Sequence, residues 1–343
     1  NGCDGPAMAV VGLWDYYLAT GDLSSLLDSK MVLEQSALEM EKRYRSDFCL
    51  VEADQSTSND AFAEPENDGF SLGSECYYML AFEAMSRIGA FTDIPEKRII
   101  TWRNYAENMK RAIRENYWNE QQGFFTSGPK GSAAYAQGMW ESSGIEAAIW
   151  DKFDIASDTQ IKNVLNALDR KGMSPFGIRL FPDRPEHNHF CGPVWVVWEA
   201  GFAAAAGKQN NQALLWKLIA QQIRNAVLHK TFYEVLESDS GKSWRWPGQL
   251  WHAAGFLSMF FYGVFGMNYS EDGLTFSPCV PFELKGMQIH GIRYRKAVLN
   301  VYVHGWGVLN EIRLDDQRIE IIPTDITGMH NVHLIMSSSL LSI

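Results

Sequence analysis

Hydrophobic residues recur at three- and four-residue spacing from Pro6 to about Gly266, which predicts a largely helical chain. The first helix covers residues 6–20 and ends at Gly21, because glycine readily takes the left-handed conformation of a helix C-cap. Asp22 is a typical N-cap for a second helix that runs to about residue 44. The same spacing predicts helices over residues 71–89, 95–117, 133–151, 158–169, 194–207, 209–228 and 248–265. The chain should therefore contain about nine helices, several with small residues such as Ala203 to Ala206 on faces that pack closely.

The segments between these helices alternate between short and long. The four long segments are polar and aromatic, and they cover residues 49–70, 118–132, 171–193 and 231–249. Long loops are uncommon in compact domains and are usually functional where they occur. We therefore expect paired helices whose long connections gather on one face of the molecule.

The hydrophobic period changes to two after Met267. Residues 291–305 alternate β-branched or aromatic side chains with polar ones, and residues 309–314, 318–322 and 332–336 continue this pattern. The prediction is a helical domain over residues 1–267 and a small antiparallel β-domain over residues 268–343.

Composition and charge narrow the function. The chain has 343 residues, of which 46% are hydrophobic and 21% are charged, as in an ordinary globular protein. A formal net charge of −11 without a basic patch argues against nucleic acid or an anionic membrane as a partner. The longest apolar stretches are too short to cross a bilayer. The chain begins without an initiator methionine, so either a leader was removed or these residues begin inside a longer protein.

Several common site types are missing from the sequence. The five cysteines are far apart and form no C-x-x-C pair, which favours buried free thiols over a zinc site or a disulfide framework. Neither G-x-S-x-G nor a glycine-rich phosphate-binding motif occurs, which argues against serine hydrolysis and nucleotide chemistry. No cofactor is expected.

The first long loop is rich in carboxylates. Within residues 51–69 it has no Lys or Arg, and its acidic residues are Glu52, Asp54, Asp60, Glu64, Glu66 and Asp68. Most of them fit a solvated acidic loop, while one or two could point into a pocket where crowding raises a carboxyl pKa. Calcium is a weaker interpretation, because the EF-hand pattern is absent.

The second and third loops supply candidate sugar-binding residues. Flat aromatic side chains suit the C–H faces of sugar rings, although core packing explains at least some of them. His187 and His189 could bind a metal with Glu186, but a clear third ligand at typical zinc spacing is lacking, so hydrogen bonds to substrate hydroxyls are preferred. The candidates from these two loops and the adjoining helices are Trp118, Trp140, Glu141, His187, His189 and Trp195.

The fourth loop combines carboxylates with aromatic residues. Alternation in an extended segment puts Glu234 and Glu237 on opposite sides, so they should have different environments and one of them can act as a base. Further candidates for substrate contact in this loop are Trp244, Trp246 and His252.

Taken in order along the chain, these elements resemble the six-hairpin glycosidases, and they are most similar to the α-L-rhamnosidase-like and glycogen-debranching-like branches. The resemblance rests on Tyr16-Tyr17 with Thr20-Gly21-Asp22, on Trp118 to Phe125, on His189 to Trp195, and on Asp272 to Pro278 followed by Gly291 to Arg295. In the second of these elements Asn119 replaces the usual acid. The matches cover nearly the whole chain, and their order carries more weight than any single motif.

The resemblance implies an (α/α)6 toroid followed by a C-terminal β cap. It also implies hydrolysis of a glycosidic bond in an oligo- or polysaccharide, usually with inversion, by an acid and a base carboxylate. Glu234 matches the base best, and Asp60, Glu64 or Glu66 would be the acid. A complete toroid has twelve helices, so the first helices and the acid could instead lie upstream of residue 1. Bacterial enzymes of this kind are often secreted or periplasmic.

Two other functions remain open at this point. A sugar phosphorylase on the same fold would need a phosphate site, for which Arg179 or Arg184 could suffice. A barrel that has lost its acid would bind carbohydrate without cleaving it.

Overall fold

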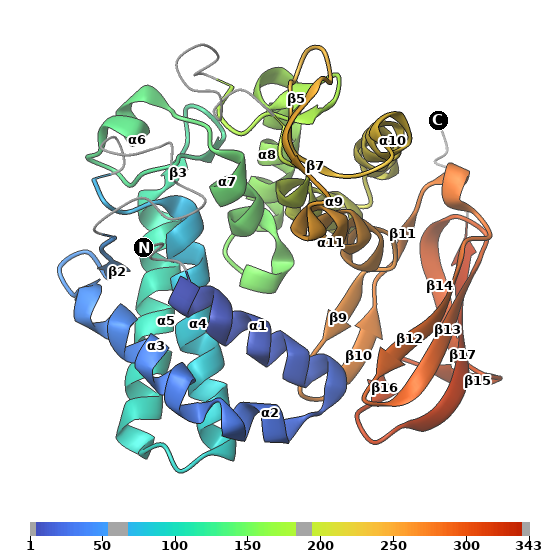
Figure 1. Cartoon of the computed structure of the whole chain (residues 1–343), viewed down its shortest axis with the longest axis horizontal. Coiled ribbons are helices and arrows are strands. Elements are labelled where there is room, and N and C mark those ends of the chain that lie inside the picture. Colours follow the sequence, from blue (N-terminus) through green and yellow to red (C-terminus); the bar gives the residue numbers. More distant parts are fainter. Residues whose placement is uncertain (1–4, 54–67, 183–193, 338–343) are drawn as a thin grey trace.

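The computed structural model describes residues 5–53, 68–182 and 194–337, and Figure 1 shows the helices and the C-terminal strands that they form. Eleven α-helices lie in these residues. They are α1 (Gly5–Thr20), α2 (Leu23–Asp28), α3 (Lys30–Arg43), α4 (Leu72–Ile88), α5 (Glu96–Asn116), α6 (Ala133–Gln137), α7 (Ser142–Ile149), α8 (Asp158–Lys171), α9 (Glu199–Lys208), α10 (Gln212–His229) and α11 (Leu250–Ser258).

The residues that were expected to end the first helix and to start the second do so. Gly21 follows α1 with φ of 71°, and the Asp22 carboxylate accepts a hydrogen bond from the backbone N–H of Ser25 at the start of α2. Two predicted helices are each split in two. A break at Ser29 separates α2 from α3, and Gly138, in a left-handed conformation with φ of 60°, ends α6 before α7 begins. The period of apolar residues continues through both breaks, so it could not reveal them.

Five helices form an inner ring. Contacts link α1 to α4, α4 to α7, α7 to α9 and α9 to α11, while α3, α5, α8 and α10 each pack outside a ring member. The last turns of α1, α4 and α9 and the segments that follow α7 and α11 all line one cavity, which shows that the five helices run in the same direction. The predicted toroid of paired helices is therefore confirmed.

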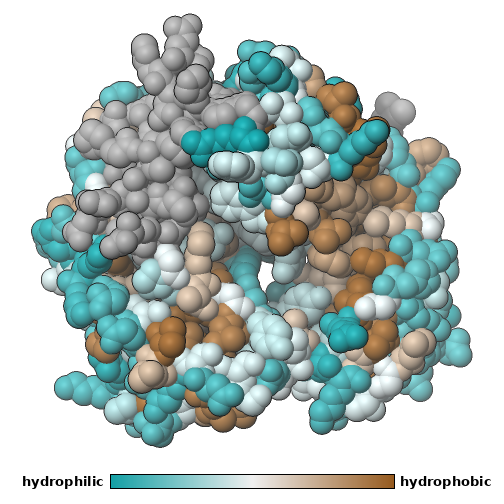
Figure 2. Space-filling view, in the orientation of Figure 1, coloured by the Kyte–Doolittle hydropathy of each residue, from teal (hydrophilic) through white to brown (hydrophobic). Residues whose placement is uncertain are grey.

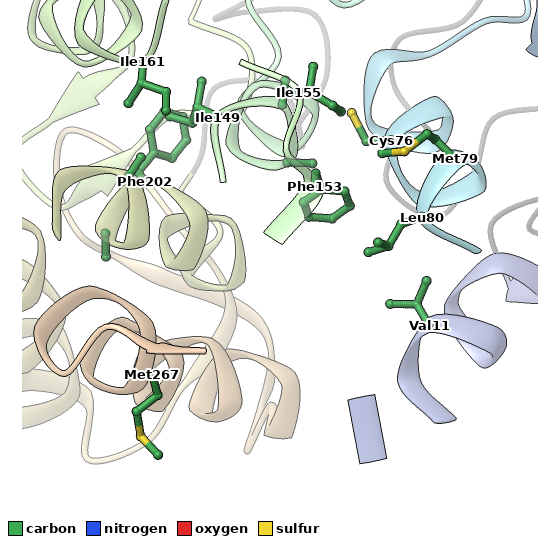
Figure 3. Packing of buried hydrophobic residues seen from close by; sticks show 14 of the residues in the cluster. Val11, Cys76, Met79, Leu80, Ile149, Phe153, Ile155, Ile161, Phe202 and Met267 are labelled. Carbon is green, nitrogen blue, oxygen red and sulfur yellow. The ribbon is translucent and has the colours of Figure 1, made fainter. Parts of the chain in front are cut away.

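Glycine allows the closest approach in this ring. A Cβ added to Gly144 in α7 would lie 2.9 Å from the backbone nitrogen of Gly73 in α4. Around such crossings the apolar side chains of several elements form one core, part of which Figure 3 shows with Val11, Leu80, Phe202 and Met267.

The strands of the two C-terminal sheets begin at Met267. A three-stranded sheet has the order β16-β10-β9, and a larger sheet has the order β11-β14-β17-β13-β12 with β15 paired to β14. Their bounds are β9 (Met267–Tyr269), β10 (Gly273–Phe276), β11 (Cys279–Val280), β12 (Gln288–Tyr294), β13 (Lys296–His304), β14 (Gly307–Leu314), β15 (Gln317–Ile319), β16 (Ile322–Pro323) and β17 (Thr327–Ser337).

The larger sheet is mixed, whereas an antiparallel one was expected. Strands β13 and β17 pair in parallel, with Lys296 opposite Thr327 and His304 opposite Ile335. Consecutive strands β13 and β14 run in opposite directions, and β17 is inserted between them. A strand in that place must be parallel to one neighbour and antiparallel to the other.

The described residues include three of the five cysteines. Cys76 and Cys279 are buried free thiols and Cys49 is a half-buried one, while Cys3 and Cys191 lie outside these residues. Of the helices that the structure describes, none combines the length and the apolar character that a membrane span requires.

Candidate active site

Each of the four long loops carries a two-stranded hairpin. The pairs are β1 (Tyr44–Arg45) with β2 (Leu50–Val51), β3 (Trp118–Asn119) with β4 (Phe124–Phe125), β5 (Met173–Ser174) with β6 (Gly177–Ile178), and β7 (Tyr233–Leu236) with β8 (Ser243–Pro247). Along the chain, the four hairpins come before α4, α7, α9 and α11 respectively. They therefore lie at the end of the ring where the inner helices begin. Figure 1 shows β3, β5 and β7 along one edge of the molecule together with α6.

Buried glutamates fasten these loops to the ring. Glu75 in the first turn of α4 accepts a hydrogen bond from the backbone N–H of Val51 at 3.0 Å, and Glu199 at the start of α9 accepts one from Ile178 at 3.0 Å. A third glutamate, Glu146 of α7, accepts from the N–H of Gly201 at 2.9 Å and so joins two ring helices. Each of the three is at most 2% exposed.

Glycine is required where one of these carboxylates meets its loop. A Cβ at Gly177 in β6 would lie 2.3 Å from Oε1 of Glu199, and φ is 148° at this residue. The Glu199 carboxyl also accepts a hydrogen bond from Gln222 at 2.8 Å. Burial raises the Glu199 pKa to about 8, although both hydrogen bonds act in the opposite direction.

Glu234, the expected base, lies on β7 opposite a β-bulge. Tyr233 pairs with Pro247 and Val235 with Trp244, so two residues of β8 stand opposite Glu234 alone. One of these two is Arg245, whose φ of 65° is unusual for a residue with a side chain. Strained backbone of this kind concentrates at functional sites.

The bulge sets the hydrogen bonding of the Glu234 carboxyl group. Arg245 donates from Nη1 to Oε1 at 3.3 Å. The other oxygen, Oε2, is buried and has no hydrogen-bond partner among the described residues. Only 14% of the Glu234 side chain is exposed. The group is thus a shielded carboxylate with one oxygen able to accept a proton.

His252 holds the backbone of this strand. Its Nδ1 accepts a hydrogen bond from the N–H of Val197 at 3.0 Å, so Nε2 carries the proton and donates to the carbonyl of Glu234 at 2.7 Å. Burial lowers the His252 pKa to about 4, which keeps the ring neutral. Since both nitrogens are bonded to backbone groups, this geometry favours a positioning role for His252 over the direct substrate contact expected from the sequence.

The turn of the β7–β8 hairpin is held by Arg179. Its guanidinium donates to Ser238 at 3.2 Å and to Asp239 at 2.8 Å. Val194 forms β-bridges with both Arg179 and Leu236, so the third and fourth loops are joined through their backbones.

The candidate tryptophans differ in exposure. Trp140 is fully buried, donates to Ser142 Oγ at 2.8 Å and packs on Phe202, which makes it a core residue. Trp118 is 8% exposed and packs against Phe125. Neither has the open ring face that stacking on a sugar would require. Trp246 is 70% exposed on β8 and does have one.

Three further candidates lie near the loops in different surroundings. Trp195 is buried edge-to-face against Trp251, next to His252. Glu141 lies directly before α7 and accepts a hydrogen bond from the Ser143 hydroxyl at 2.7 Å, without exposure to solvent. Glu237 is exposed at the hairpin turn, where Ser240 donates to it. As predicted, Glu234 and Glu237 have different environments.

The remaining candidates are outside the described residues. They are Asp60, Glu64 and Glu66 of the first loop and His187 and His189 of the third. For Trp244 only the backbone, in β8, is described. Within the described residues, no three or more His, Cys, Asp or Glu side chains are grouped so that they could hold a metal ion.

Sequence reasoning missed Glu75, Glu146 and Arg245. Both glutamates lie among small and apolar residues of a helix, as Glu199 does, and this setting is the signal by which the sequence could have identified them. The position of Arg245 had no such signal, because it depends on the bulge in β8.

The chain resembles known glycosidases in three dimensions. It superposes on a structure named Sialidase with a TM-score of 0.72 and 16% identity, covering 88% of this chain and 31% of that one. A GH63 mannosylglycerate hydrolase from Thermus thermophilus, solved in complex with glucose, matches with a TM-score of 0.58 and 13% identity over 76% of this chain and 75% of that one. An uncharacterized conserved protein from the same organism matches with a TM-score of 0.55 and 13% identity, over 74% and 75%.

These likenesses define the class of fold. The chain has a glycosidase-like fold, a ring of helices followed by a C-terminal sheet. It spans about a third of the length of the sialidase-named protein. No protein-family model and no curated protein matches its sequence.

Proposed function

We propose that this protein is a glycoside hydrolase that cleaves an oligo- or polysaccharide by an inverting two-carboxylate mechanism. The observation that supports the proposal best is the Glu234 carboxyl group, which is shielded and bonded to Arg245 through one oxygen while the other accepts no hydrogen bond from a described residue. A carboxylate with an oxygen that no described residue bonds can serve as a base once substrate binding brings water to it.

In the proposed reaction Glu234 is the general base. Its carboxylate accepts a proton from water while the water oxygen attacks the anomeric carbon, and a second carboxylic acid protonates the departing glycosidic oxygen. Arg245 orients the base through Oε1, and His252 fixes its backbone. The acid would be Asp60, Glu64 or Glu66, or a residue upstream of residue 1. Trp246 is the best supported sugar-stacking residue, because it is 70% exposed and belongs to the bulge opposite Glu234.

A phosphorylase is less well supported. The guanidinium of Arg179, which could have bound phosphate, is already bonded to Ser238 and Asp239. Arg184, the other candidate, lies outside the described residues.

Replacement of the base tests the proposal. Glu234→Gln keeps the size of the side chain but removes its basicity, so hydrolysis should fall by about 10²–10⁴-fold. Activity is measured as release of reducing sugar from a panel of neutral oligosaccharides, and proton NMR of the first product gives the stereochemistry. Glu120→Gln, an exposed glutamate at the turn of another long-loop hairpin, is the control and should retain full activity.

Two results would contradict the proposal. Equal rates for wild type and Glu234→Gln would remove Glu234 as the base. Binding of the oligosaccharides by the wild type without any release of reducing sugar would favour a carbohydrate-binding protein instead.

A further inference from the structure

A large cavity lies at the other end of the helical ring. Its volume is about 690 Å³, within the usual range of about 300–1,000 Å³ for small-molecule sites. The last turns of α1, α4 and α9 line it together with Trp150 to Lys152, the π-helical turn after α11, and strands β9, β10 and β14. Figure 2 shows an opening near the middle of the molecule, in the region where Figure 1 has α1, α11 and β9.

This cavity is separate from the surroundings of Glu234. Helix α9 begins at Glu199, which is bonded to β6 of the long loops, and ends at Lys208, which lines the cavity. Its ten residues correspond to a rise of about 14 Å. A ligand in the cavity would therefore occupy a second site.

Aromatic rings form part of the cavity wall. Trp150 and Tyr262 meet edge-to-face with ring centroids 5.1 Å apart and an interplanar angle of 65°. Both side chains are half-buried and so keep some surface open to the cavity. Such rings suit the C–H faces of a sugar.

Polar groups stand next to these rings. Asp151 is an exposed residue that lines the cavity. The surrounding protein raises the pKa of this carboxyl by desolvation, although Lys208 acts in the opposite direction. The Lys152 ammonium group is bound to Asp15 and lies 5.9 Å from the Trp150 ring centroid. Hydroxyl groups of a ligand could bind both.

The charges of the lining disfavour an acidic ligand. Four carboxylates, from Asp15, Glu83, Asp151 and Glu271, face three cations, from Arg87, Lys152 and Lys208. Arg87 is already bonded to Glu83 and Glu271 at 2.8 and 2.7 Å. The lining thus carries one more carboxylate than cation, which disfavours an anion.

We propose that this cavity binds an uncharged oligosaccharide, whose ring faces pack on Trp150 and Tyr262 and whose hydroxyls bind Asp151 and Lys152. The site would retain carbohydrate at the end of the ring opposite Glu234. This proposal does not depend on hydrolytic activity at Glu234, because the class of ligand is inferred from the cavity lining alone.

Titration of the Glu234→Gln protein with maltotriose and mannotriose tests this proposal. In ¹H–¹⁵N spectra the indole resonance of Trp150, assigned with Trp150→Phe, should shift on addition of at least one of these sugars, and trigalacturonate should leave it unchanged. Asp151→Asn should weaken this binding by tenfold or more. Asp154→Asn is the matched control, because Asp154 is three residues further on, pairs with Lys110 and does not line the cavity.

The outcomes separate this proposal from the hydrolase proposal. If neither neutral trisaccharide shifts the Trp150 resonance, or if Asp151→Asn and Asp154→Asn bind equally well, the cavity is not a carbohydrate site, whatever the hydrolytic activity. If the resonance shifts while the wild type hydrolyses nothing, the second site stands and the proposed catalytic function fails.

Discussion

At the scale of single residues, the most informative side chains are the buried glutamates of the ring helices. Their partners lie far away in the sequence: Val51 is 24 residues from Glu75, and Gly201 is 55 residues from Glu146. The burial of Glu199 could be predicted from its apolar neighbours. The backbone group that it binds could not, because that depends on how the loop folds over the ring.

Glu199 should make stability depend on pH. Its carboxyl keeps a proton up to a pKa of about 8 in the folded protein, whereas the ordinary value is 4.5. The stabilisation is complete below pH 4.5 and is lost as pH rises towards 8, by about 5 kcal/mol. Glu199→Gln cannot ionise, so urea unfolding should show the variant gaining stability relative to wild type over this range. A constant difference from pH 4.5 to 8 would show that Glu199 ionises normally.

At the scale of elements, the β7–β8 hairpin contains the bulge that orients Glu234, and side chains of neighbouring segments hold the hairpin by hydrogen bonds. His252 links α11 to β7 and to Val197, and Arg179 fixes the turn. Alternation along the sequence correctly placed Glu234 and Glu237 in different environments. The bulge and these hydrogen bonds arise from contacts between loops, so no local pattern predicts them.

His252 should give the opposite pH dependence. Its folded pKa of about 4 is below the ordinary 6.5, so its stabilisation is present above pH 6.5 and is lost as pH falls to 4, by about 3 kcal/mol. His252→Leu removes both hydrogen bonds and should cost about 1–3 kcal/mol at pH 7. In urea unfolding, the difference between wild type and variant should shrink below pH 6.5. An unchanged difference at pH 5 would contradict the neutral, buried state of His252.

At the scale of the whole molecule, the C-terminal strands are attached to the first helix. The N–H of Arg295 donates to the carbonyl of Ala19 at 2.8 Å, and its guanidinium lies 5.1 Å from the ring centroid of Tyr17. The change of period after Met267 was enough to predict strands after the helices. The contact with α1 joins residues 276 positions apart, and the parallel pairing of β17 with β13 joins residues 31 positions apart. Periodicity describes only neighbouring positions, so it predicts neither.

Loss of the Arg295 side chain tests this attachment. Arg295→Ala should lower the free energy of unfolding by about 1–2 kcal/mol, because it removes the cation–π contact and the packing of the aliphatic stem on α1. Arg293→Ala, an exposed residue of β12 two positions earlier, is the control and should change it by no more than about 0.5 kcal/mol. Thermal unfolding monitored by circular dichroism provides the measurement, and equal midpoints for the two variants would contradict the attachment.

The common direction of the inner helices has an electrostatic consequence. The peptide dipoles of a helix sum to about half a positive charge at its N-terminal end. Because α1, α4, α7, α9 and α11 all begin beneath the long loops, their positive ends converge there, and Glu75, Glu141 and Glu199 stand at three of them. These helix ends thus offset part of the negative charge that carboxylates bring to this end of the ring.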